Sequence, residues 1–231
     1  MKAFLLAAGA GTRLRPLTDR IPKCLIPIGG KALLDIWLDK LERLGVTETR
    51  VNTHHLAAQV EDHVARRPAA AMPLSLFHEP ELMGSAGTIR ANRAWLETER
   101  EFLIIYADNL TDADLAPFVA CHRERQAEFT LGVFQTDAPR ECGIVTTDET
   151  GRVTAFEEKP AAPRSNWANA GIYLAGPSLF EVIPDRPGLC DFGYDVLPRL
   201  VGRMHACPLE GFFCDIGTAA RLEYARRMWR G

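Results

Sequence analysis

The chain changes between two hydrophobic periods, which predicts strands and helices in turn. Continuous apolar runs cover residues 3–8 and 102–107, and runs of this length are typical of strands buried on both faces. A further strand is expected over Phe129–Phe134. From Lys31 to Leu44, by contrast, leucines and Trp37 recur at spacings of three and four, which predicts an amphipathic helix. A buried first strand followed by an amphipathic helix therefore opens the predicted fold.

The same periods predict further elements in the first part of the chain. Strands are expected over Thr49–Thr53 and Leu74–His78, and helices over Leu56–Val64, Gly84–Leu96 and Leu115–Gln126. Because strands and helices alternate here, we predict an α/β fold with a Rossmann-like, mostly parallel sheet and helices on both faces.

The pattern changes near Cys142, where strands begin to follow one another directly. Gly143–Thr147 and Val153–Glu157 flank a Glu-Thr-Gly turn, and this arrangement predicts a hairpin. Another strand is expected over Ala168–Leu174 and a closing helix over Ala219–Trp229. The second part of the chain is therefore predicted to form a small β-rich lobe.

Length and composition favour one domain with two lobes. A chain of 231 residues can bury one large core, and its sequence contains no repeat or flexible linker. We expect a single domain over 1–231, with one lobe over 1–141 and the β-rich lobe over 142–231.

Charge and cysteine usage narrow the class of protein. The net charge of −3 gives no electrostatic basis for binding nucleic acid or an anionic membrane. No apolar run approaches the roughly 20 residues that a membrane helix needs. The six cysteines are scattered without a Cys-x-x-Cys pair, which predicts reduced thiols in a cytoplasmic protein.

The end of the first strand is the strongest candidate for chemistry. The run breaks into small residues at Gly9–Thr12, where backbone N–H groups can approach an anion closely. Arg13 and Lys23 follow, and a glycine-rich turn with cations suits a polyphosphate. A plain strand-to-loop turn with surface basic residues is the alternative. The dinucleotide fingerprint is incomplete, because its third glycine would fall at Leu14.

Longer strings around this turn resemble a known family. Leu-Ala-Ala-Gly-Ala-Gly-Thr-Arg-Leu-Arg-Pro-Leu-Thr, followed by Pro-Lys-Cys-Leu-Ile-Pro-Ile, resembles the N-terminal motif of sugar-1-phosphate nucleotidylyltransferases. The resemblance continues in ordered motifs from Met1 to Thr218. It implies that a sugar 1-phosphate oxygen attacks the α-phosphorus of a nucleoside triphosphate in line, so that pyrophosphate leaves. The lobe over 1–141 would then mainly bind nucleotide, and the lobe over 142–231 mainly sugar phosphate.

Two aspartates suit a metal ion. Asp108 follows the strand over 102–107, at the end where open α/β sheets bind ligands, and Asp215 precedes the closing helix. A turn residue and a helix cap are the respective alternatives. Ala-Asp-Asn-Leu and Asp-Ile-Gly-Thr both resemble metal-aspartate motifs of the family, and hard carboxylate oxygens beside a triphosphate imply Mg²⁺.

The resemblance also assigns the nucleotide site. It implies that Lys23 stabilises charge at the α-phosphate and Arg13 at the leaving pyrophosphate, and these two are the expected catalytic residues. The expected nucleotide-binding residues are Ala7, Ala8, Gly9, Gly11, Thr12, Arg13, Lys23, Glu79, Gly84, Ala86, Gly87 and Asp108. Two roles for Glu79 stay open, an acceptor for an amino group of guanine and a solvated loop acid.

A second set of residues resembles the sugar-phosphate motifs of the family. Glu-Glu-Lys-Pro at 157–160 implies that Lys159 binds the sugar phosphate and Glu158 a sugar hydroxyl, the alternative being a charged strand end. An Asn-Ala-Gly string follows at 169–171. The expected sugar-phosphate residues are Asn109, Gly143, Glu158, Lys159, Asn169 and Gly171.

The substrate pair is less determined than the reaction class. The segment 191–198 resembles one found in mannose- and heptose-1-phosphate guanylyltransferases, and Glu79 could accept from guanine, so GTP with a manno-configured sugar, mannose or heptose 1-phosphate, is favoured. The alternatives are UTP or dTTP with N-acetylmuramate or glucose 1-phosphate, a non-sugar acceptor such as phosphocholine, or a catalytically silent binding module. The chain resembles the compact members of the family. A monomer or homodimer that serves cell-envelope polysaccharide synthesis is expected.

Overall fold

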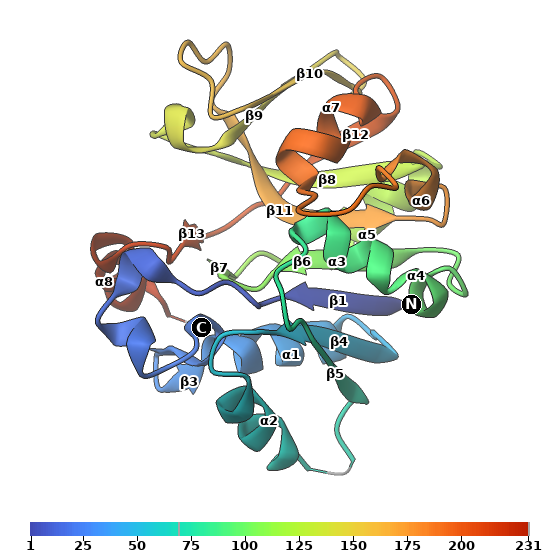
Figure 1. The fold of residues 1–231 in the computed structure, drawn as a ribbon. Coiled ribbons are helices and arrows are strands. Elements are labelled where there is room, and N and C mark those ends of the chain that lie inside the picture. Colours follow the sequence, from blue (N-terminus) through green and yellow to red (C-terminus); the bar gives the residue numbers. More distant parts are fainter. Residues whose placement is uncertain (69, 231) are drawn as a thin grey trace. The chain divides into compact units, whose positions relative to one another are not determined.

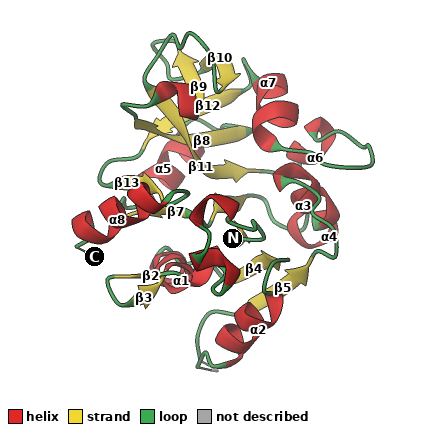
Figure 2. Ribbon diagram, turned by 60° about the vertical axis from the view of Figure 1, so that its left-hand side comes forward, coloured by secondary structure: helices red, strands yellow, loops and turns green. Residues whose placement is uncertain are grey.

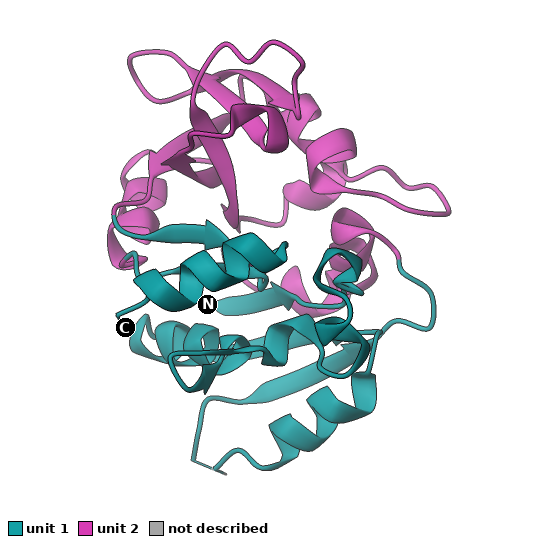
Figure 3. Ribbon diagram, turned by 90° about the vertical axis from the view of Figure 1, so that its left-hand side faces the viewer, with its two compact units in different colours: residues 1–82, 105–113, 211–231 teal, residues 83–104, 114–210 magenta. Residues whose placement is uncertain are grey.

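A computed structural model describes residues 1–68 and 70–230. The chain divides into two compact units (Figure 3). Unit 1 comprises Met1–Leu82, Ile105–Ala113 and Gly211–Gly231, and unit 2 comprises Met83–Ile104 and Asp114–Glu210. The end of the chain thus returns to the unit that contains its beginning, whereas the expected lobes divided the chain once, after residue 141. The single-domain organisation stays a prediction.

A parallel sheet forms the centre of unit 1. Strand β1, Lys2–Leu6, pairs in parallel with β4, Glu48–Thr53, and β4 pairs in parallel with β5, Leu74–His78. Ala3, Phe4 and Leu5 of β1 have no exposed surface. The apolar run at the start of the chain is therefore a strand buried on both faces, as predicted.

Helices and short turns complete unit 1, and they can be followed in Figures 1 and 2. They are the 3₁₀ turns η1 (Thr12–Leu14), η2 (Leu17–Asp19) and η3 (Lys23–Leu25), the hairpin of β2 (Pro27–Ile28) and β3 (Lys31–Ala32), and helices α1 (Leu33–Arg43), α2 (Ala57–Ala65) and α8 (Ala219–Met228). In α1 the predicted apolar face is buried, and Gly45, at φ 80°, follows its end.

A two-stranded ribbon joins distant parts of the sequence within unit 1. Strand β6, Phe102–Tyr106, contains the division between the units, and Ala107 after it donates to the carbonyl of Leu6 at 3.0 Å. Strand β7, Asn109–Thr111, then pairs antiparallel with β13, Phe213–Asp215. The sequence patterns predicted neither β7 nor β13, because strands of three residues are too short to display a period.

Unit 2 contains a mainly antiparallel sheet. Its strands are β8 (Phe129–Gln135), β9 (Gly143–Thr147), β10 (Val153–Glu158), β11 (Trp167–Ala175) and β12 (Met204–Pro208). Strands β9 and β10 form the predicted hairpin, and β11 pairs antiparallel with β8 and β9. Strand β12, which the sequence patterns missed, pairs in parallel with β8.

Short helices complete unit 2. They are α3 (Ser85–Ala91), α4 (Arg93–Leu96), α5 (Ala116–Glu124), η4 (Pro139–Glu141), α6 (Leu179–Val182), the π-helix η5 (Phe192–Val196) and α7 (Leu197–Leu200). Phe192 of η5 lies with its ring 5.1 Å from that of Tyr173, and the ring of Tyr173 lies 5.4 Å from that of Phe129. This aromatic cluster fixes η5 on the sheet of unit 2.

One cysteine pair contradicts the expectation of six reduced thiols. Cys121 of α5 and Cys207 of β12 form a disulfide within unit 2. The expectation failed because it used sequence spacing alone, and 86 positions separate these residues. The other four cysteines are free thiols. Among the described residues, no helix has the length and apolar content needed to cross a bilayer.

Candidate functional site

The turn after β1 is shaped by one glycine. Gly11 has a left-handed backbone at φ 61°, and its carbonyl accepts from the hydroxyl of Thr18 at 2.8 Å. A Cβ atom on Gly11 would lie 2.8 Å from Cγ2 of Thr18. Both the backbone angle and the close approach therefore require glycine here. Gly9 is exposed and has open space around its Cα atom, which leaves that side of the turn accessible.

The N–H groups just before the turn are already bonded within the chain. Ala7 and Ala8 both donate to Oδ1 of Asn52, at 2.6 and 3.2 Å. Asn52 lies in β4 and donates in turn to Oε1 of Glu79 at 2.7 Å. The sequence analysis missed Asn52. A signal for Asn52 was present in the sequence, because an amide side chain lies near the end of the strand predicted over Thr49–Thr53.

Glu79 is a buried carboxylate. Only 1% of the residue is exposed, its N–H donates to the carbonyl of Thr53 at 2.8 Å, and its own carbonyl bonds Nδ1 of His54 at 2.8 Å. The alternative that Glu79 is a solvated loop acid is therefore wrong. Through Asn52, Glu79 is connected to the residues just before the β1 turn.

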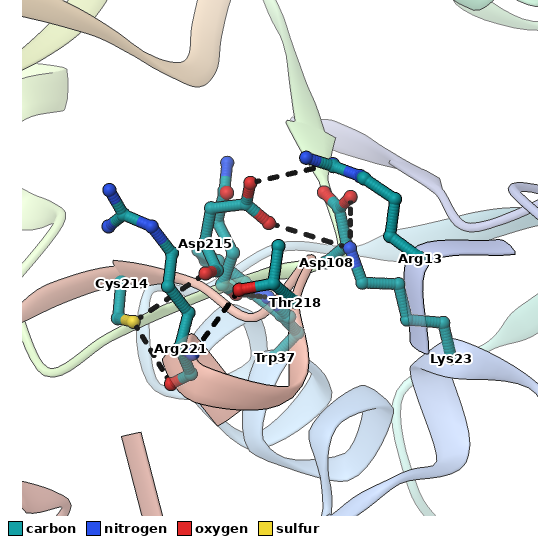
Figure 4. Close-up of polar contacts among 9 residues, drawn as sticks. Arg13, Lys23, Trp37, Asp108, Cys214, Asp215, Thr218 and Arg221 are labelled. Carbon is teal, nitrogen blue, oxygen red and sulfur yellow. Dashed lines mark hydrogen bonds and ion pairs between the residues drawn. The ribbon is translucent and has the colours of Figure 1, made fainter. Parts of the chain in front are cut away.

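Lys23 lies between the two predicted metal aspartates (Figure 4). Its Nζ is 2.7 Å from Oδ2 of Asp108 and 3.5 Å from Oδ1 of Asp215. The side chain of Lys23 is 8% exposed, whereas those of Asp108 and Asp215 are 39% and 42% exposed. The ammonium group of Lys23 is thus buried, whereas solvent or a ligand can reach the two carboxylates that it contacts.

Arg13 approaches the same group from the nucleotide turn. Its Nη2 lies 4.0 Å from Oδ2 of Asp215, and its side chain is 68% exposed. A Cβ atom on Gly217 would lie 2.7 Å from Nη2 of Arg13 and 2.9 Å from Oδ1 of Asp215. A side chain at Gly217 would therefore force the guanidinium group of Arg13 or the carboxylate of Asp215 to shift, and the sequence analysis did not include Gly217 among the site residues.

The β7–β13 ribbon explains why the two aspartates meet. Asn109 pairs in register with Asp215, and Ile216 donates to the carbonyl of Asp108 at 3.3 Å. Nε1 of Trp37 in α1 donates to the carbonyl of Asn109 at 2.8 Å and anchors the ribbon. Asn109 is itself only 9% exposed, so the ribbon holds it largely away from solvent.

These four charged groups fit an ion and a polyphosphate. Two carboxylates offer hard oxygen ligands of the kind that Mg²⁺ takes, with waters and phosphate oxygens completing its shell. Arg13 offers a planar fork of donors, and Lys23 a point charge. The fit to a metal ion rests on the chemistry of these donors. Lys23 holds the two carboxylates, Asp108 and Asp215, close together.

In unit 2, the start of α3 is bound by another segment of the chain. The N–H groups of Ala86 and Gly87 donate to the carbonyl of Cys190 at 2.9 and 3.0 Å. A Cβ atom on Gly84 would lie 2.5 Å from that carbonyl oxygen. Asp191 also accepts from Ser85. The small residues expected near the nucleotide thus allow a close backbone approach, and two of their N–H groups are used within the chain.

Glu158 occupies a cradle between two glycines. A Cβ atom on either Gly143 or Gly193 would lie 2.7 Å from Oε2 of Glu158. Burial raises the pKa of Glu158, Lys159 lowers it and Asp191 raises it further. Gly193, in the π-helix η5, was missed by the sequence analysis. A π-helical turn is often found at functional sites, but its residues give no distinctive period.

Two other residues of the expected sugar-phosphate set have a constrained conformation, Lys159 in its backbone and Asn169 in its side chain. Lys159 has a left-handed backbone at φ 48°, which is unusual for a residue with a side chain, and its side chain is 57% exposed. Asn169 donates to the hydroxyl of Tyr173 at 2.8 Å and accepts from the N–H of Gly171 at 3.0 Å. Strained, conformationally fixed residues often mark ligand sites.

The structure gathers the predicted residues into two groups, one in each unit. Arg13, Lys23, Asp108 and Asp215 form the first. Glu158 and Lys159, with Gly143 beside them, form the second. Among the described residues, no cluster of three or more His, Cys, Asp and Glu side chains has metal-binding geometry, so the first group offers two carboxylates and no more.

Comparisons with known proteins cover nearly the whole chain. A family model described as nucleotidyl transferase matches residues 2–228. UTP–glucose-1-phosphate uridylyltransferase of Synechocystis is 32% identical, over 94% of this chain and 60% of that protein. Mannose-1-phosphate guanyltransferase beta-A of Xenopus laevis is 31% identical, over 94% of this chain and 61% of that protein. The chain thus spans about three fifths of the length of these curated relatives.

Solved structures share the fold. A proposed glucose-1-phosphate thymidylyltransferase from Bacillus anthracis, in complex with sucrose, superposes with a TM-score of 0.90 at 23% identity, over 99% of this chain and 94% of that chain. HddC from Yersinia pseudotuberculosis, complexed with GMP-PN, gives a TM-score of 0.80 at 24% identity over 99% of both chains. These likenesses confirm the predicted α/β fold class with its mostly parallel sheet.

Proposed function

Because this chain belongs to the nucleotidyl transferase family, we propose that it condenses a nucleoside triphosphate with a sugar 1-phosphate. The sugar phosphate oxygen attacks the α-phosphorus, the bond to the β-phosphate oxygen breaks, and pyrophosphate leaves. The products are a nucleotide sugar and pyrophosphate. Family membership supports the class of reaction, whereas the substrates and the residue roles are inferred from this chain.

One observation carries the proposal, namely the contact of Lys23 with both Asp108 and Asp215. A phosphoryl-group transfer between anions needs positive charge and correct positioning more than it needs a nucleophile. In this site a buried ammonium group and an exposed guanidinium group lie beside two carboxylates. A purely structural ion pair would not need Arg13 and the glycine at position 217 next to it.

The residues of unit 1 divide the work on the triphosphate. Gly9, Gly11 and Thr12 offer backbone groups to the phosphates, Lys23 balances charge at the α-phosphate, and Arg13 binds the leaving pyrophosphate. Mg²⁺, bound by Asp108 and Asp215, would neutralise phosphate charge and orient the triphosphate. When nucleotide and metal bind, we expect the lysine to exchange one carboxylate partner for a phosphate oxygen.

The residues of unit 2 would hold the acceptor. Lys159 carries an exposed ammonium group suited to the sugar phosphate, and Glu158 offers a carboxylate to a sugar hydroxyl. Asn169 is oriented by its bonds to Tyr173 and Gly171. Asn109, which the sequence analysis expected in the same set, lies in unit 1 and is only 9% exposed, so we do not place it with these residues. The fixed backbone at these positions supports a preorganised site.

For the substrates, we propose GTP with a manno-configured sugar 1-phosphate. Similarity to mannose-1-phosphate guanyltransferases supports this choice, and similarity to a UTP–glucose-1-phosphate uridylyltransferase supports UTP with glucose 1-phosphate as the second candidate. Their identities to this chain are 31% and 32%, so the comparison weighs the two pairs equally. The preference rests on the sequence of segment 191–198.

A substrate matrix tests the proposal. Purified protein with Mg²⁺ would receive GTP, UTP, dTTP, CTP or ATP against mannose, glucose, heptose and N-acetylmuramate 1-phosphates and phosphocholine, with pyrophosphate release as the readout. We expect release with one pair to exceed that with all others, and release to stop when the sugar phosphate is omitted. No release with any pair, from folded protein that still binds nucleotide, would favour the silent binding module instead.

A further inference from the structure

The amide of Asn52 connects two segments that are far apart in the sequence. Its Oδ1 accepts from the N–H groups of Ala7 and Ala8, and its Nδ2 donates to Oε1 of Glu79. Asn52 is 4% exposed and Glu79 is 1% exposed. The last residues before the nucleotide turn are therefore held, through one side chain, by a buried carboxylate.

This arrangement has only one workable orientation. If the amide of Asn52 were turned over, its NH₂ group would face two N–H donors and its oxygen would face a carboxylate, so every bond would become a repulsion. The two backbone donors thus fix the amide oxygen toward Ala7 and Ala8, and Oε1 of Glu79 accepts from the NH₂ group on the other side. The amide in turn satisfies the buried N–H of Ala8 and the part-buried N–H of Ala7, which would otherwise lack these bonds.

We propose that Glu79 and Asn52 are a positioning pair for the nucleotide turn, and that Glu79 acts through Asn52 rather than by reading the base. The inference rests on the proposed function, because it takes the turn at Gly9–Thr12 as the triphosphate site. It assigns a role to Asn52 and replaces the expected contact between Glu79 and guanine. Base preference is then set by other residues.

Burial is the physical reason for choosing this role. A carboxylate that reads the amino edge of guanine must present an acceptor to the ligand, whereas Glu79 has almost no surface and one oxygen already accepts from Asn52. The backbone of Ala7 and Ala8, in contrast, leads directly into the exposed turn. A shift of the turn would displace the phosphates of every nucleotide equally, since all nucleoside triphosphates share them.

The experiment compares variants across nucleotides. We expect Glu79→Ala and Asn52→Ala each to lower kcat/KM about 10²-fold, the effect of misplacing a reacting group by about 1 Å. The loss should be equal for GTP, ITP and UTP, with the KM for sugar 1-phosphate unchanged. The double variant should lose no more than either single variant, because the two side chains act as one unit. Glu79→Gln, whose amide oxygen still accepts from Asn52, should remain within about 3-fold of the parent for every nucleotide.

A matched control separates positioning from plain stability. Thr49→Ala alters a fully buried residue of the same strand whose hydroxyl bonds Sδ of Met72, away from the turn. We expect it to lower Tm without changing kcat/KM. If Asn52→Ala behaves like this control, the positioning role is overturned. A Glu79→Gln variant that loses GTP selectively over ITP and UTP would instead establish base reading and overturn the proposal.

The binding of a fluorescent nucleotide analogue keeps this test independent of turnover. If the parent binds the analogue but releases no pyrophosphate with any acceptor, the proposed reaction fails. The positioning pair is then judged by the Kd of the analogue, which should rise in Asn52→Ala and Glu79→Ala and stay near the parent value in Glu79→Gln and Thr49→Ala. A parent protein that binds no nucleotide would overturn both proposals.

Discussion

The ammonium group of Lys23 lies 2.7 Å from the carboxylate of Asp108, although 85 positions separate them in the chain. The lysine is buried and the aspartate is exposed on one side. The positive charge of the buried Lys23 therefore lies next to the part of Asp108 that a ligand can reach. Asp215 lies on the same cation at 3.5 Å, so one lysine holds both carboxylates before any ligand arrives.

Replacing Lys23 should abolish most turnover. We expect Lys23→Met, which keeps the buried stem, to lower kcat about 10²–10³-fold, the usual cost of removing one preorganised group that stabilises developing charge. Lys23→Ala should lose at least as much. Pyrophosphate release measures the effect, and circular dichroism checks the fold. Arg20→Ala is the control, because Arg20 is an exposed cation nearby in sequence and should leave the rate unchanged. Near-normal turnover in folded Lys23→Met would exclude the assigned role.

Asp215 should determine how much metal the protein needs. Asp215→Asn removes one anionic oxygen donor from the proposed site, so we expect the Mg²⁺ concentration for half-maximal rate to rise about 10-fold or more. A second readout is the increase in Tm that Mg²⁺ and nucleotide give together, which should shrink in the variant. Chelation by EDTA should stop the reaction of the parent protein, and excess Mg²⁺ should restore it. An unchanged Mg²⁺ requirement in the variant would remove Asp215 from the metal site.

Gly193 should control affinity for the sugar phosphate. Gly193→Ala places a methyl group 2.7 Å from Oε2 of Glu158, and this overlap should displace the carboxylate and raise the KM for sugar 1-phosphate about 10-fold. The KM for nucleotide serves as an internal control and should not change. Glu158→Asp shortens the displaced side chain, so adding Gly193→Ala to it should raise KM no further. Additive effects of the two changes would show that the glycine acts elsewhere.

Acid should weaken sugar-phosphate binding through Glu158. Because burial raises the pKa of Glu158 in the folded protein, its carboxylate is lost on acidification at a pH above the ordinary glutamate value of 4.5. We expect Glu158→Gln to bind sugar 1-phosphate less tightly than the parent at neutral pH, and the difference to vanish as pH falls through that raised pKa. The ratio of the two KM values is the measurement, since titration of the substrate phosphate cancels in it. A ratio independent of pH would contradict this role.

The disulfide between Cys121 and Cys207 should be measurable by thiol counting. Denatured, unreduced protein should expose four thiols to a chromogenic disulfide reagent, and reduced protein six. Reduction should lower Tm by roughly 5–15 °C, because a cross-link of this kind contributes about 2–4 kcal/mol. Cys207→Ser should reproduce the shift, and Cys142→Ser, at a free thiol, should not. Six thiols in the unreduced protein would refute the pairing.

The sequence predicted the larger elements because their periods extend over many residues. The apolar run at β1, the leucine spacing of α1 and the β9–β10 hairpin all agree with the structure within a few residues. The ribbon of β7 and β13 escaped prediction, because its pairing is set by tertiary contacts such as the bond from Trp37 to Asn109. Asp108 and Asp215 were therefore singled out from sequence motifs, but their shared contact with Lys23 could not be predicted from the spacing.

Sequence reasoning on the site was limited chiefly by burial. The sequence left two roles open for Glu79, an acceptor for guanine and a solvated loop acid, and only the fold reveals its burial and its contact with Asn52. Gly143 was expected among the sugar-phosphate residues, and the structure shows the space that it leaves for Glu158. Gly193, in the π-helix η5, leaves the same space from the other side, and a lone glycine gives no such signal in the sequence. These are relationships between residues distant in sequence, which local patterns do not encode.

The β7–β13 ribbon has a consequence for how the protein is made. A chain emerging from the ribosome carries Lys23 and Asp108 well before Asp215 and the strand that contains it. Until residues 213–215 are synthesised, β7 lacks the partner strand that it pairs with in the finished unit, and Lys23 has one of its two carboxylates only. Vectorial synthesis thus delays assembly of the charged centre, so partly made chains should be unable to bind the metal and triphosphate that we propose for it.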